Sequence, residues 1–219
     1  MSWSELFIHL LGGLQVTAII TAASTVFGAI CAFAGGIGKL SPIRAVRWLA
    51  AAYVEIFRGT SLLVQLFWLF FALPFLGVRL SPMGAGILGL SLNIGAYGAE
   101  VVRGAIVAVD EGQYEAAKAL NFTGRQTLWR IVLPQAIVEM MPTFGNLAIQ
   151  NLKDSSLVSL ITLTDLTFTA DNLRNETLQT IPIFTLTLFI YFGLALILAG
   201  FMRWLEAKTE RMAGRVKAS

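Results

Sequence analysis

Several acidic and basic residues lie within strongly apolar stretches and are spaced to interact. Glu55 and Arg58 are three residues apart, as are Glu100 and Arg103. Each pair therefore lies on one helix face and can form an ion pair within one turn. Charges at membrane depth persist only when they are paired or hydrated. The two pairs either hold one helix against another, or exchange partners between helices to open and close a passage.

Polar side chains extend from these charges as stripes on three predicted helices. Buried amides need hydrogen-bond partners, which neighbouring helices can supply. The alternative is a hydrated passage, which three stripes meeting in one small bundle favour. We predict that four of these residues line a substrate path: Gln65, Asn93, Tyr97 and Gln150. Six charged residues are predicted to act in gating or helix pairing: Glu55, Arg58, Glu100, Arg103, Lys153 and Asp154.

Residues suited to catalysis or metal binding are scarce. His9 is the only histidine and Cys31 the only cysteine, so the chain can assemble neither a Cys/His dyad nor a metal-ligand cluster. The run GGIGK at 35–39 is similar to a phosphate loop, but Phe33 replaces its first glycine and Leu40 its serine or threonine. We predict no catalytic and no metal site. If the function of the protein uses ATP, another subunit must bind the nucleotide.

The composition is that of a membrane protein. Hydrophobic residues make up 56% of the 219 residues and charged residues 13%, and the mean hydropathy is +0.73. Charge-free runs are long enough to cross a hydrocarbon core of about 30 Å. We predict an all-α membrane protein in one domain, with about five transmembrane helices near 10–37, 53–73, 84–108, 139–162 and 182–205. The fourth contains Pro142, Lys153 and Asp154, and so must pack inside protein or beside water.

The basic residues predict the orientation. Three lie in the first connection, three in the segment 110–135 and five in the C-terminal tail, whereas the opposite side has only Arg79 and Arg174. The positive-inside rule therefore places segment 110–135 and the C-terminus in the cytoplasm and the N-terminus outside. The net charge of +3 reflects this topology and not a nucleic-acid partner.

Small residues and local caps predict some of the helix geometry. Four small residues recur at four-residue intervals in the first helix, which lets another helix pack closely: Ser24, Gly28, Ala32 and Gly36. Ser41-Pro42 and Ser81-Pro82 each have the pattern of an N-cap followed by proline at the first helical position. The helix after Ser41 is expected to begin along the inner membrane surface.

Segment 110–135 is the longest polar stretch and predicts two short helices. The first is rich in helix formers and ends at Asn121, a residue that tolerates left-handed backbone. Thr123 and Gln126 have the spacing of a capping box for the second. Pro134 marks the end of that helix or a kink. An ordinary amphipathic hairpin is the alternative to a functional element.

Residues in this segment resemble a known motif. The run E-A-A at Glu115, Ala116 and Ala117, followed by I-V-L-P at 131–134, resembles the cytoplasmic EAA coupling loop of ABC importer permeases. That family usually has glycine where this chain has Asn121. Because asparagine also tolerates a positive φ, the resemblance to the fold is unaffected.

Three further segments resemble the polar-amino-acid branch of these permeases. They are E-x-x-R-G-T-S at 55–61, A-Y-x-x-E-x-x-R-G at 96–104 and L-K-D-S-S-L at 152–157. The last has Ser155 where the branch usually has threonine. The resemblance thus covers most of the chain from Tyr53 to Asp165.

The resemblance implies a complex in the bacterial inner membrane. It would contain a second permease subunit, two cytoplasmic ATPases that use the ATP, and an extracytoplasmic solute-binding protein. Segment 110–135 would dock in the ATPase and move as a lever, with Glu115, Ala116 and Ala117 forming the close contact and Leu128 and Trp129 anchoring the second helix. The coupling residues are therefore predicted to be Gln113, Glu115, Ala116, Ala117, Asn121, Leu128, Trp129 and Pro134.

The substrate and the overall function class leave alternatives. The branch handles polar amino acids, and some segments look like ectoine/hydroxyectoine permeases. Ectoine is a zwitterion whose delocalised cation could contact the ring of Trp68 or Tyr97. Residues 165–180 are expected to form an outer docking surface or a plain solvated loop. The rival functions are an ion-coupled carrier or channel that needs no ATPase, and a membrane scaffold that transports nothing.

Overall fold

The computed structural model describes residues 3–217, except for the side chains of residues 212, 213 and 215–217. Every element within that range is helical. The α-helices are α1 Trp3–Lys39, α2 Arg44–Gly59, α3 Leu62–Phe67, α4 Pro82–Val107, α5 Glu111–Ala119, α6 Gly124–Thr127, α7 Leu133–Asp154, α8 Leu166–Thr177 and α9 Thr180–Lys217. Shorter turns join some of them: the π-turns η1 Trp68–Ala72 and η3 Leu128–Val132, and the 3₁₀ turns η2 Leu73–Leu76 and η4 Ser155–Ile161.

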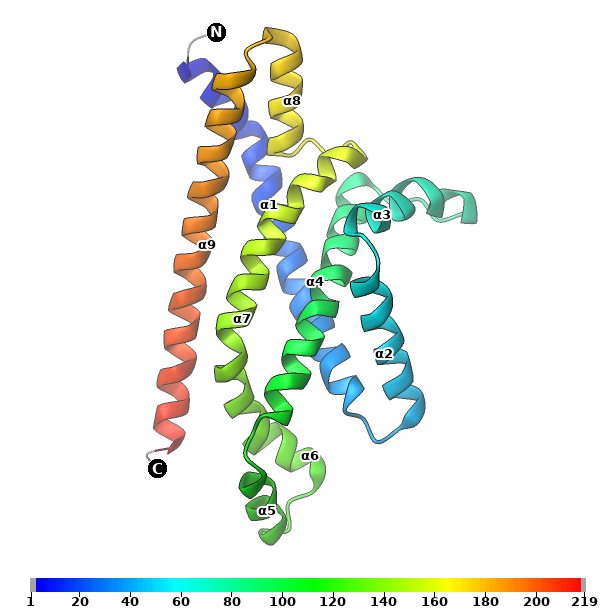
Figure 1. Ribbon diagram of the computed structural model, residues 1–219, viewed down its shortest axis with the longest axis vertical. Helices are drawn as coiled ribbons and strands as arrows, with labels where there is room; N and C mark the ends of the chain where they lie inside the picture. Colours follow the sequence, from blue (N-terminus) through cyan, green and yellow to red (C-terminus); the bar gives the residue numbers. More distant parts are fainter. Residues whose placement is uncertain (1–2, 218–219) are drawn as a thin grey trace.

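The long helices α1 and α4 cross at the centre of the bundle, with α7 and α9 on one side and α2 on the other (Figure 1). Small residues permit the close contact between α1 and α4. A Cβ added at Gly36 would lie 2.7 Å from the carbonyl oxygen of Ala99, and one at Gly28 would lie 2.4 Å from Ile94. The predicted stripe of small residues on α1 is therefore a packing surface, as expected.

Two polar elements extend beyond the bundle at opposite ends (Figure 1). The helix α8 lies at one end, beside the start of α1, and α5 and α6 lie at the other. An apolar cluster packs α8 against α1 and α9 through Leu6, Leu10, Leu166, Ala170, Leu173 and Ile183. A second cluster joins α1, α4, η3 and α7 above the α5–α6 end through Ala32, Val102, Ala105, Ile106, Val132, Leu133, Ala136 and Met140. Both polar ends are thus fixed to the bundle by buried apolar contacts.

The predicted second span is not one continuous helix. The helix α2 ends at Gly59, and the segment Leu62–Leu76 continues at an angle of 105° to it. In Figure 1 this second part projects sideways from the bundle. The expectation of an unbroken helix over 53–73 is therefore wrong, and the break falls at Thr60 and Ser61.

Three helices of the described range are long and apolar enough to cross a membrane: Trp3–Lys39, Pro82–Val107 and Thr180–Arg211. The bent pair of α2 and Leu62–Leu76 would be a fourth. The predicted fourth span begins earlier than expected, at Leu133, and its α-helix ends at Asp154, where η4 follows. The count of five spans stays a prediction.

One of the two predicted serine caps is correct. The Ser81 hydroxyl accepts a hydrogen bond from the Gly84 N–H, and Pro82 is the first residue of α4. At the other site the Ser41 hydroxyl accepts from the Ile43 N–H at 3.2 Å, but α2 begins only at Arg44 and has no side-chain cap. Ser41 therefore stabilises the turn before the helix. The helix α2 runs alongside the bundle from its first residues (Figure 1). It therefore does not begin with a segment that lies across the end of the bundle, as a helix along the membrane surface would.

Candidate functional site

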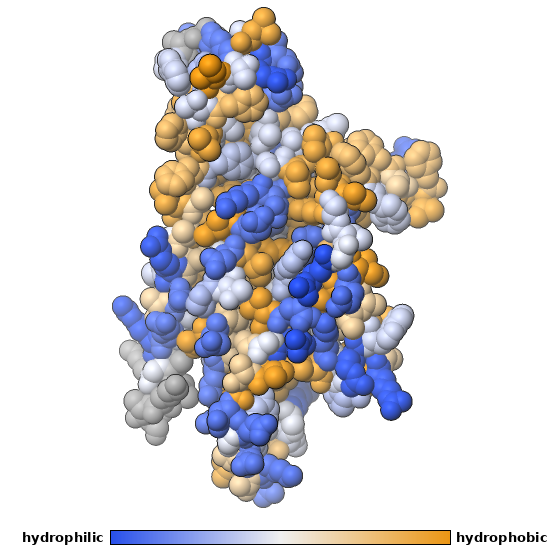
Figure 2. Space-filling model, viewed as in Figure 1, coloured by the Kyte–Doolittle hydropathy of each residue, from blue (hydrophilic) through white to orange (hydrophobic). Residues whose placement is uncertain are grey.

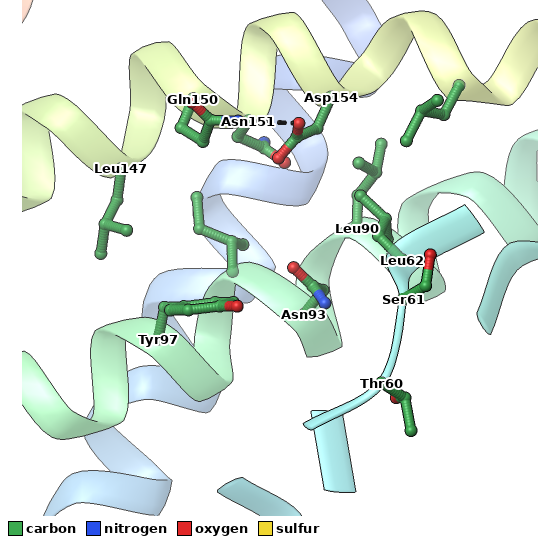
Figure 3. Close-up of a pocket in the computed structure, with 12 residues that line it drawn as sticks. Thr60, Ser61, Leu62, Leu90, Asn93, Tyr97, Leu147, Gln150, Asn151 and Asp154 are labelled. Atoms are coloured by element: carbon green, nitrogen blue, oxygen red, sulfur yellow. Dashed lines mark hydrogen bonds between the residues drawn. The ribbon is translucent and has the colours of Figure 1, made fainter. Parts of the chain in front are cut away.

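A cavity of about 430 Å³ with several polar side chains in its wall lies where the break after α2 faces α4 and α7. Figure 3 shows Thr60 and Ser61 on one side, Asn93 and Tyr97 of α4 on another, and α7 across the third. The polar residues that line the cavity are Thr60, Ser61, Asn93, Tyr97, Gln150, Asn151 and Asp154. Each wall comes from a different part of the sequence.

Three of the four predicted substrate-lining residues line this cavity: Asn93, Tyr97 and Gln150. The fourth, Gln65, is not among its lining residues. The Gln65 amide instead donates to the Phe57 carbonyl at 2.9 Å and to the Thr60 hydroxyl at 2.8 Å. Gln65 therefore lies beside the cavity, hydrogen-bonded to the end of α2, and its place on the substrate path stays a prediction.

Asp154 supplies the one carboxylate among the lining residues of the cavity. Its Oδ1 accepts a hydrogen bond from the Gln150 amide at 2.9 Å, one helical turn earlier (Figure 3). That bond orients the carboxylate and leaves its other oxygen able to accept from a ligand. The predicted role of Asp154 was gating or helix pairing, whereas its position suits binding of a cationic group.

The sequence interpretation missed Thr60 and Asn151. Asn151 is buried and ties α7 to α1, because its amide donates to the Ser24 hydroxyl at 2.7 Å and to the Thr25 hydroxyl at 2.9 Å. The run Gly59-Thr60-Ser61 carries a signal that could have indicated the break, since glycine, threonine and serine favour helix ends.

The predicted gating charges form a different network from the one expected. The Arg103 Nε lies 2.9 Å from Glu100, so this predicted pair is confirmed. The Glu55–Arg58 pair does not form: Glu55 is 74% exposed and its partner is Lys39, at 3.9 Å. The Arg58 guanidinium lies over the ring of Tyr97, 5.3 Å from the ring centre.

Lys39 connects these helices, and the sequence interpretation missed it. Its ammonium hydrogen-bonds Glu100, so the end of α1 is tied to α4. Lys39 and Glu100 are both mostly buried, with side-chain exposures of 16% and 21%. Lys153 is exposed on α7 and forms no ion pair within 4 Å among the described residues, so its predicted pairing is not observed in the single chain.

The segment 110–135 forms a second candidate site at the far end from α8. Asn121 has a φ of 58° and ends α5 in a Schellman motif, in which the Phe122 N–H donates to Ala117 and the Asn121 N–H to Lys118, both at 3.0 Å. Thr123 and Gln126 form the predicted capping box of α6. Both sequence-based predictions of local geometry are confirmed.

This segment is also tied to the bundle. The Tyr114 hydroxyl donates to the Ile106 carbonyl at 3.0 Å, and burial raises the pKa of this phenol. The Gln135 amide of α7 donates to the Gln113 side chain at 3.3 Å. An open groove of about 1100 Å³ lies between α5, the start of α7 and Thr209 of α9. The segment is therefore an ordered unit with a surface into which a partner can dock.

The predicted coupling residues divide into two groups. Six are exposed: Gln113, Glu115, Ala116, Asn121, Trp129 and Pro134. Ala117 is 0% exposed and so is covered within this chain, but it borders the open groove, and its predicted contact with another subunit stays a prediction.

The second helix of the segment also differs from the expectation. Leu128 packs against the apolar cluster of α4 and α7 and anchors the helix as predicted. Trp129 is 55% exposed and does not anchor it within this chain. Pro134 lies in the first turn of α7, directly after the π-turn η3, so the second helix continues into α7 and does not end there.

Comparison with known proteins identifies the family. Residues 24–211 match the family described as binding-protein-dependent transport system inner membrane component. The chain belongs to this family. It is 58% identical to a probable amino-acid ABC transporter permease protein of Sinorhizobium fredii, over 98% of this chain and 92% of that protein. It is 35% identical to the L-cystine transport system permease protein TcyB of Bacillus subtilis, over 93% of this chain and 88% of that protein.

Solved structures of ABC transporters have the same fold as this chain. A crystal structure of an amino acid ABC transporter with histidines superposes with a TM-score of 0.84 at 33% identity, covering 94% of this chain and 95% of that one. An inward-facing structure of the MetNI methionine ABC transporter has the same fold, with a TM-score of 0.80 at 18% identity over 95% and 99% of the two chains. The resemblance to ABC importer permeases of the polar-amino-acid branch is thus confirmed. As a membrane component of such a system, the chain is a transport subunit without a catalytic site of its own.

Proposed function

We propose that this permease forms the passage for a polar amino acid across the bacterial inner membrane, with the cavity between the α2 break, α4 and α7 on the substrate path. The observation that carries the proposal is the convergence of Asp154, Asn93 and Tyr97 from separate elements on one cavity. Relatives over nearly the whole chain are permeases of amino-acid systems, and this supports the substrate class.

The chemistry of the cavity suits a zwitterion. A carboxylate can accept charge-assisted hydrogen bonds from the ammonium group of an amino acid, and Asp154 is placed to do so. The hydroxyl of Ser61 and the side-chain oxygen of Asn93 add neutral hydrogen-bonding groups, whereas the amide N–H groups of Asn93 and Asn151 are already donated within the chain. Transporters commonly hold their substrate near the middle of the membrane, at a site with a small number of polar groups.

The surface of the single chain supports a second permease subunit. Figure 2 shows hydrophilic residues across the middle of one face, with apolar surface on either side. A polar face at membrane depth is costly against lipid and is stable against protein or water. We therefore propose that a copy or a related chain covers this face and encloses the passage, with lipid on the apolar surfaces.

The two ends of the bundle are proposed to contact the other subunits. Two ATPases, which use the ATP, would dock with α5, α6 and η3 on the cytoplasmic side. The C-terminus would lie on the same side of the membrane. The solute-binding protein would dock on the exposed face of α8 on the outer side, near the N-terminus. Residues 165–180 are mainly a helix, so the alternative of a plain loop is wrong, and Asp165 is buried and not part of that surface.

The candidate substrates follow from the relatives. Cystine, glutamine and histidine occur in the names of similar systems and structures, and we propose an amino acid of this kind. Ectoine and hydroxyectoine are the second candidates, but the aromatic contact expected for them has little support. Trp68 does not line the cavity, and Arg58 already lies over the ring of Tyr97.

The test is uptake by the purified complex. The chain is isolated in mild detergent with its copurifying subunits, reconstituted in vesicles, and supplied with binding protein and labelled L-histidine, L-cystine, L-glutamine or ectoine. We expect ATP-dependent uptake of an amino acid, and Asp154→Asn to reduce it. Uptake by the chain alone without ATP would show an ion-coupled carrier, and no solute-dependent ATP hydrolysis in any complex would show a scaffold; either result overturns the proposal.

A further inference from the structure

The break between α2 and α3 leaves backbone carbonyls that need new partners. A carbonyl in the last turn of a helix has no partner within the helix. In a continuous helix the Phe57 carbonyl would accept from the N–H of Ser61, four residues later. Here Thr60 is extended, with φ −119° and ψ 154°, and the chain turns away before that bond can form.

Two side-chain amides take the place of this missing donor. The Gln65 amide of α3 donates to the Phe57 carbonyl at 2.9 Å, and the Asn93 amide of α4 donates to the same oxygen at 3.0 Å. The Asn93 amide also donates to the Gln65 side-chain oxygen at 3.2 Å. The three groups form a closed network that joins the end of α2, the start of α3 and the middle of α4.

Gln65 makes two further contacts with the break. Its amide lies 2.8 Å from the Thr60 hydroxyl and 3.3 Å from the Thr60 carbonyl. The Thr60 hydroxyl in turn donates to the Ile56 carbonyl at 2.8 Å. The carbonyls of Ile56 and Phe57 are thus satisfied by side chains, without requiring the helix to continue.

The break forms one wall of the cavity. Thr60 and Ser61 line it, whereas Gln65 does not. In Figure 3 the Asn93 amide nitrogen points toward the Thr60–Leu62 segment and its oxygen toward α7. The Ser61 hydroxyl has no hydrogen-bond partner among the described residues, so it is available to a ligand.

We infer that Gln65 and Asn93 are positioning residues that hold α2 broken, so that Thr60 and Ser61 stay in the wall of the passage. Without their amides, the Phe57 carbonyl is best satisfied by the Ser61 N–H, and α2 extends by about one residue or more. Ser61 then leaves the wall. The transport part of this inference rests on the proposed function, but the position of the break does not.

The first experiment tests the break without transport. In a Cys31→Ala background, Ser61→Cys is introduced into the assembled complex and its labelling by a small charged thiosulfonate reagent is timed. We expect Gln65→Met, which keeps the side-chain length but cannot donate, to slow labelling at least about tenfold, because it removes the part-buried hydrogen bond to the Phe57 carbonyl together with those to Thr60. Asn93→Leu is the second variant and should act in the same direction.

The matched control is Tyr53→Phe. The Tyr53 hydroxyl donates to the Leu92 carbonyl at 2.8 Å, so this change removes a part-buried hydrogen bond between α2 and α4 that lies away from the break. Labelling at position 61 should change less than about twofold. Unchanged labelling in Gln65→Met or Asn93→Leu, or an equal loss in Tyr53→Phe, overturns the inference.

The second experiment separates positioning from general damage. Amino acid uptake and ATP hydrolysis are measured in the same vesicles for Gln65→Met and Tyr53→Phe. We expect the amount transported per ATP to fall about tenfold for Gln65→Met only, whereas a merely structural defect lowers both activities together and overturns the positioning role. If Gln65→Met slows the labelling of position 61 but keeps full uptake, the role of Gln65 in holding the break stands, and the proposed substrate path along the break is overturned.

Discussion

The segment 110–135 and the cavity differ in how far apart in sequence their residues lie. The first is a continuous stretch whose bends are made by bonds between close neighbours, such as the capping box of Thr123 and Gln126. The cavity is assembled from residues 60–62, from α4 and from the end of α7. One site is encoded locally, and the other exists only after three helices have packed.

This difference explains why one site was predicted more accurately than the other. A cap or a left-handed residue has the same partner in the isolated segment as in the folded chain. An amide within a span has many possible partners, and the packed helices decide between them. Asn93 and Gln65 look equivalent in sequence, yet only Asn93 lines the cavity.

The largest effect is expected from Ala117→Arg, which tests whether the coupling segment is a packed unit. Ala117 is completely buried, so overpacking and a buried unpaired charge should together lower uptake at least ~100-fold. Hydrogen exchange over residues 111–127 should increase at the same time. Ala119→Arg, at an exposed position of the same helix, is the control for packing and should leave the hydrogen exchange of these residues unchanged. Full uptake by Ala117→Arg would show that the segment is not packed as described.

Asp154→Asn should have the next largest effect and tests the cavity. The neutral amide keeps the size of the side chain but cannot form a charge-assisted bond with an ammonium group, so uptake should fall roughly 10- to 100-fold. ATP hydrolysis without substrate should change little. Glu206→Gln removes a carboxylate of α9 outside the cavity and is the matched control. Equal uptake by Asp154→Asn and the unmodified protein would exclude Asp154 from the substrate path.

Asp165 combines a local cap with tertiary burial and so sharpens the comparison. It caps α8 by accepting from the Phe168 N–H at 2.9 Å, as its sequence position allows. Burial, however, raises its pKa from 3.8 to about 6. The folded protein therefore holds this proton more tightly than the unfolded chain, and stability should fall as the pH rises from about 4 to about 6.

The measurement is the thermal midpoint in detergent between pH 4 and 7.5. The free energy of unfolding obtained from these transitions should fall with rising pH over the titration range of Asp165. Its slope there should approach about 1.4 kcal/mol per pH unit. Asp165→Asn should lose that slope, whereas Asp171→Asn, at an exposed position of the same helix, should keep it. A slope that survives in Asp165→Asn would assign the pH dependence to another group.

The smallest effects are expected at Asn121, where the geometry is local. Asn121→Gly should raise stability or leave it within about 1 kcal/mol, because glycine adopts a positive φ without strain. Asn121→Val should cost about 1–2 kcal/mol. Thermal midpoints compare the two variants, and uptake by Asn121→Gly should stay unchanged. A stable Asn121→Val would contradict the left-handed end of α5.

Much of the fold could be predicted from the sequence. Hydropathy predicted the long helices, and the serine cap of α4, the capping box and the left-handed Asn121 were all read from short patterns. The break in α2 was not predicted, because its stability depends on Asn93, which lies 36 residues after Phe57 in the chain. The link from Lys39 to Glu100 was missed for the same reason: the two residues belong to different helices.

The amino-acid sequence by itself determined the membrane class, the family and the local geometry of the coupling segment, because these depend on composition, short motifs and bonds between neighbours. Tertiary structure alone decided which polar side chains face the cavity, which are used to satisfy the broken helix, and that Ala117 is buried. The physical reason is that each buried hydrogen-bonding group must find a partner, and only the packed helices determine which partners are within reach.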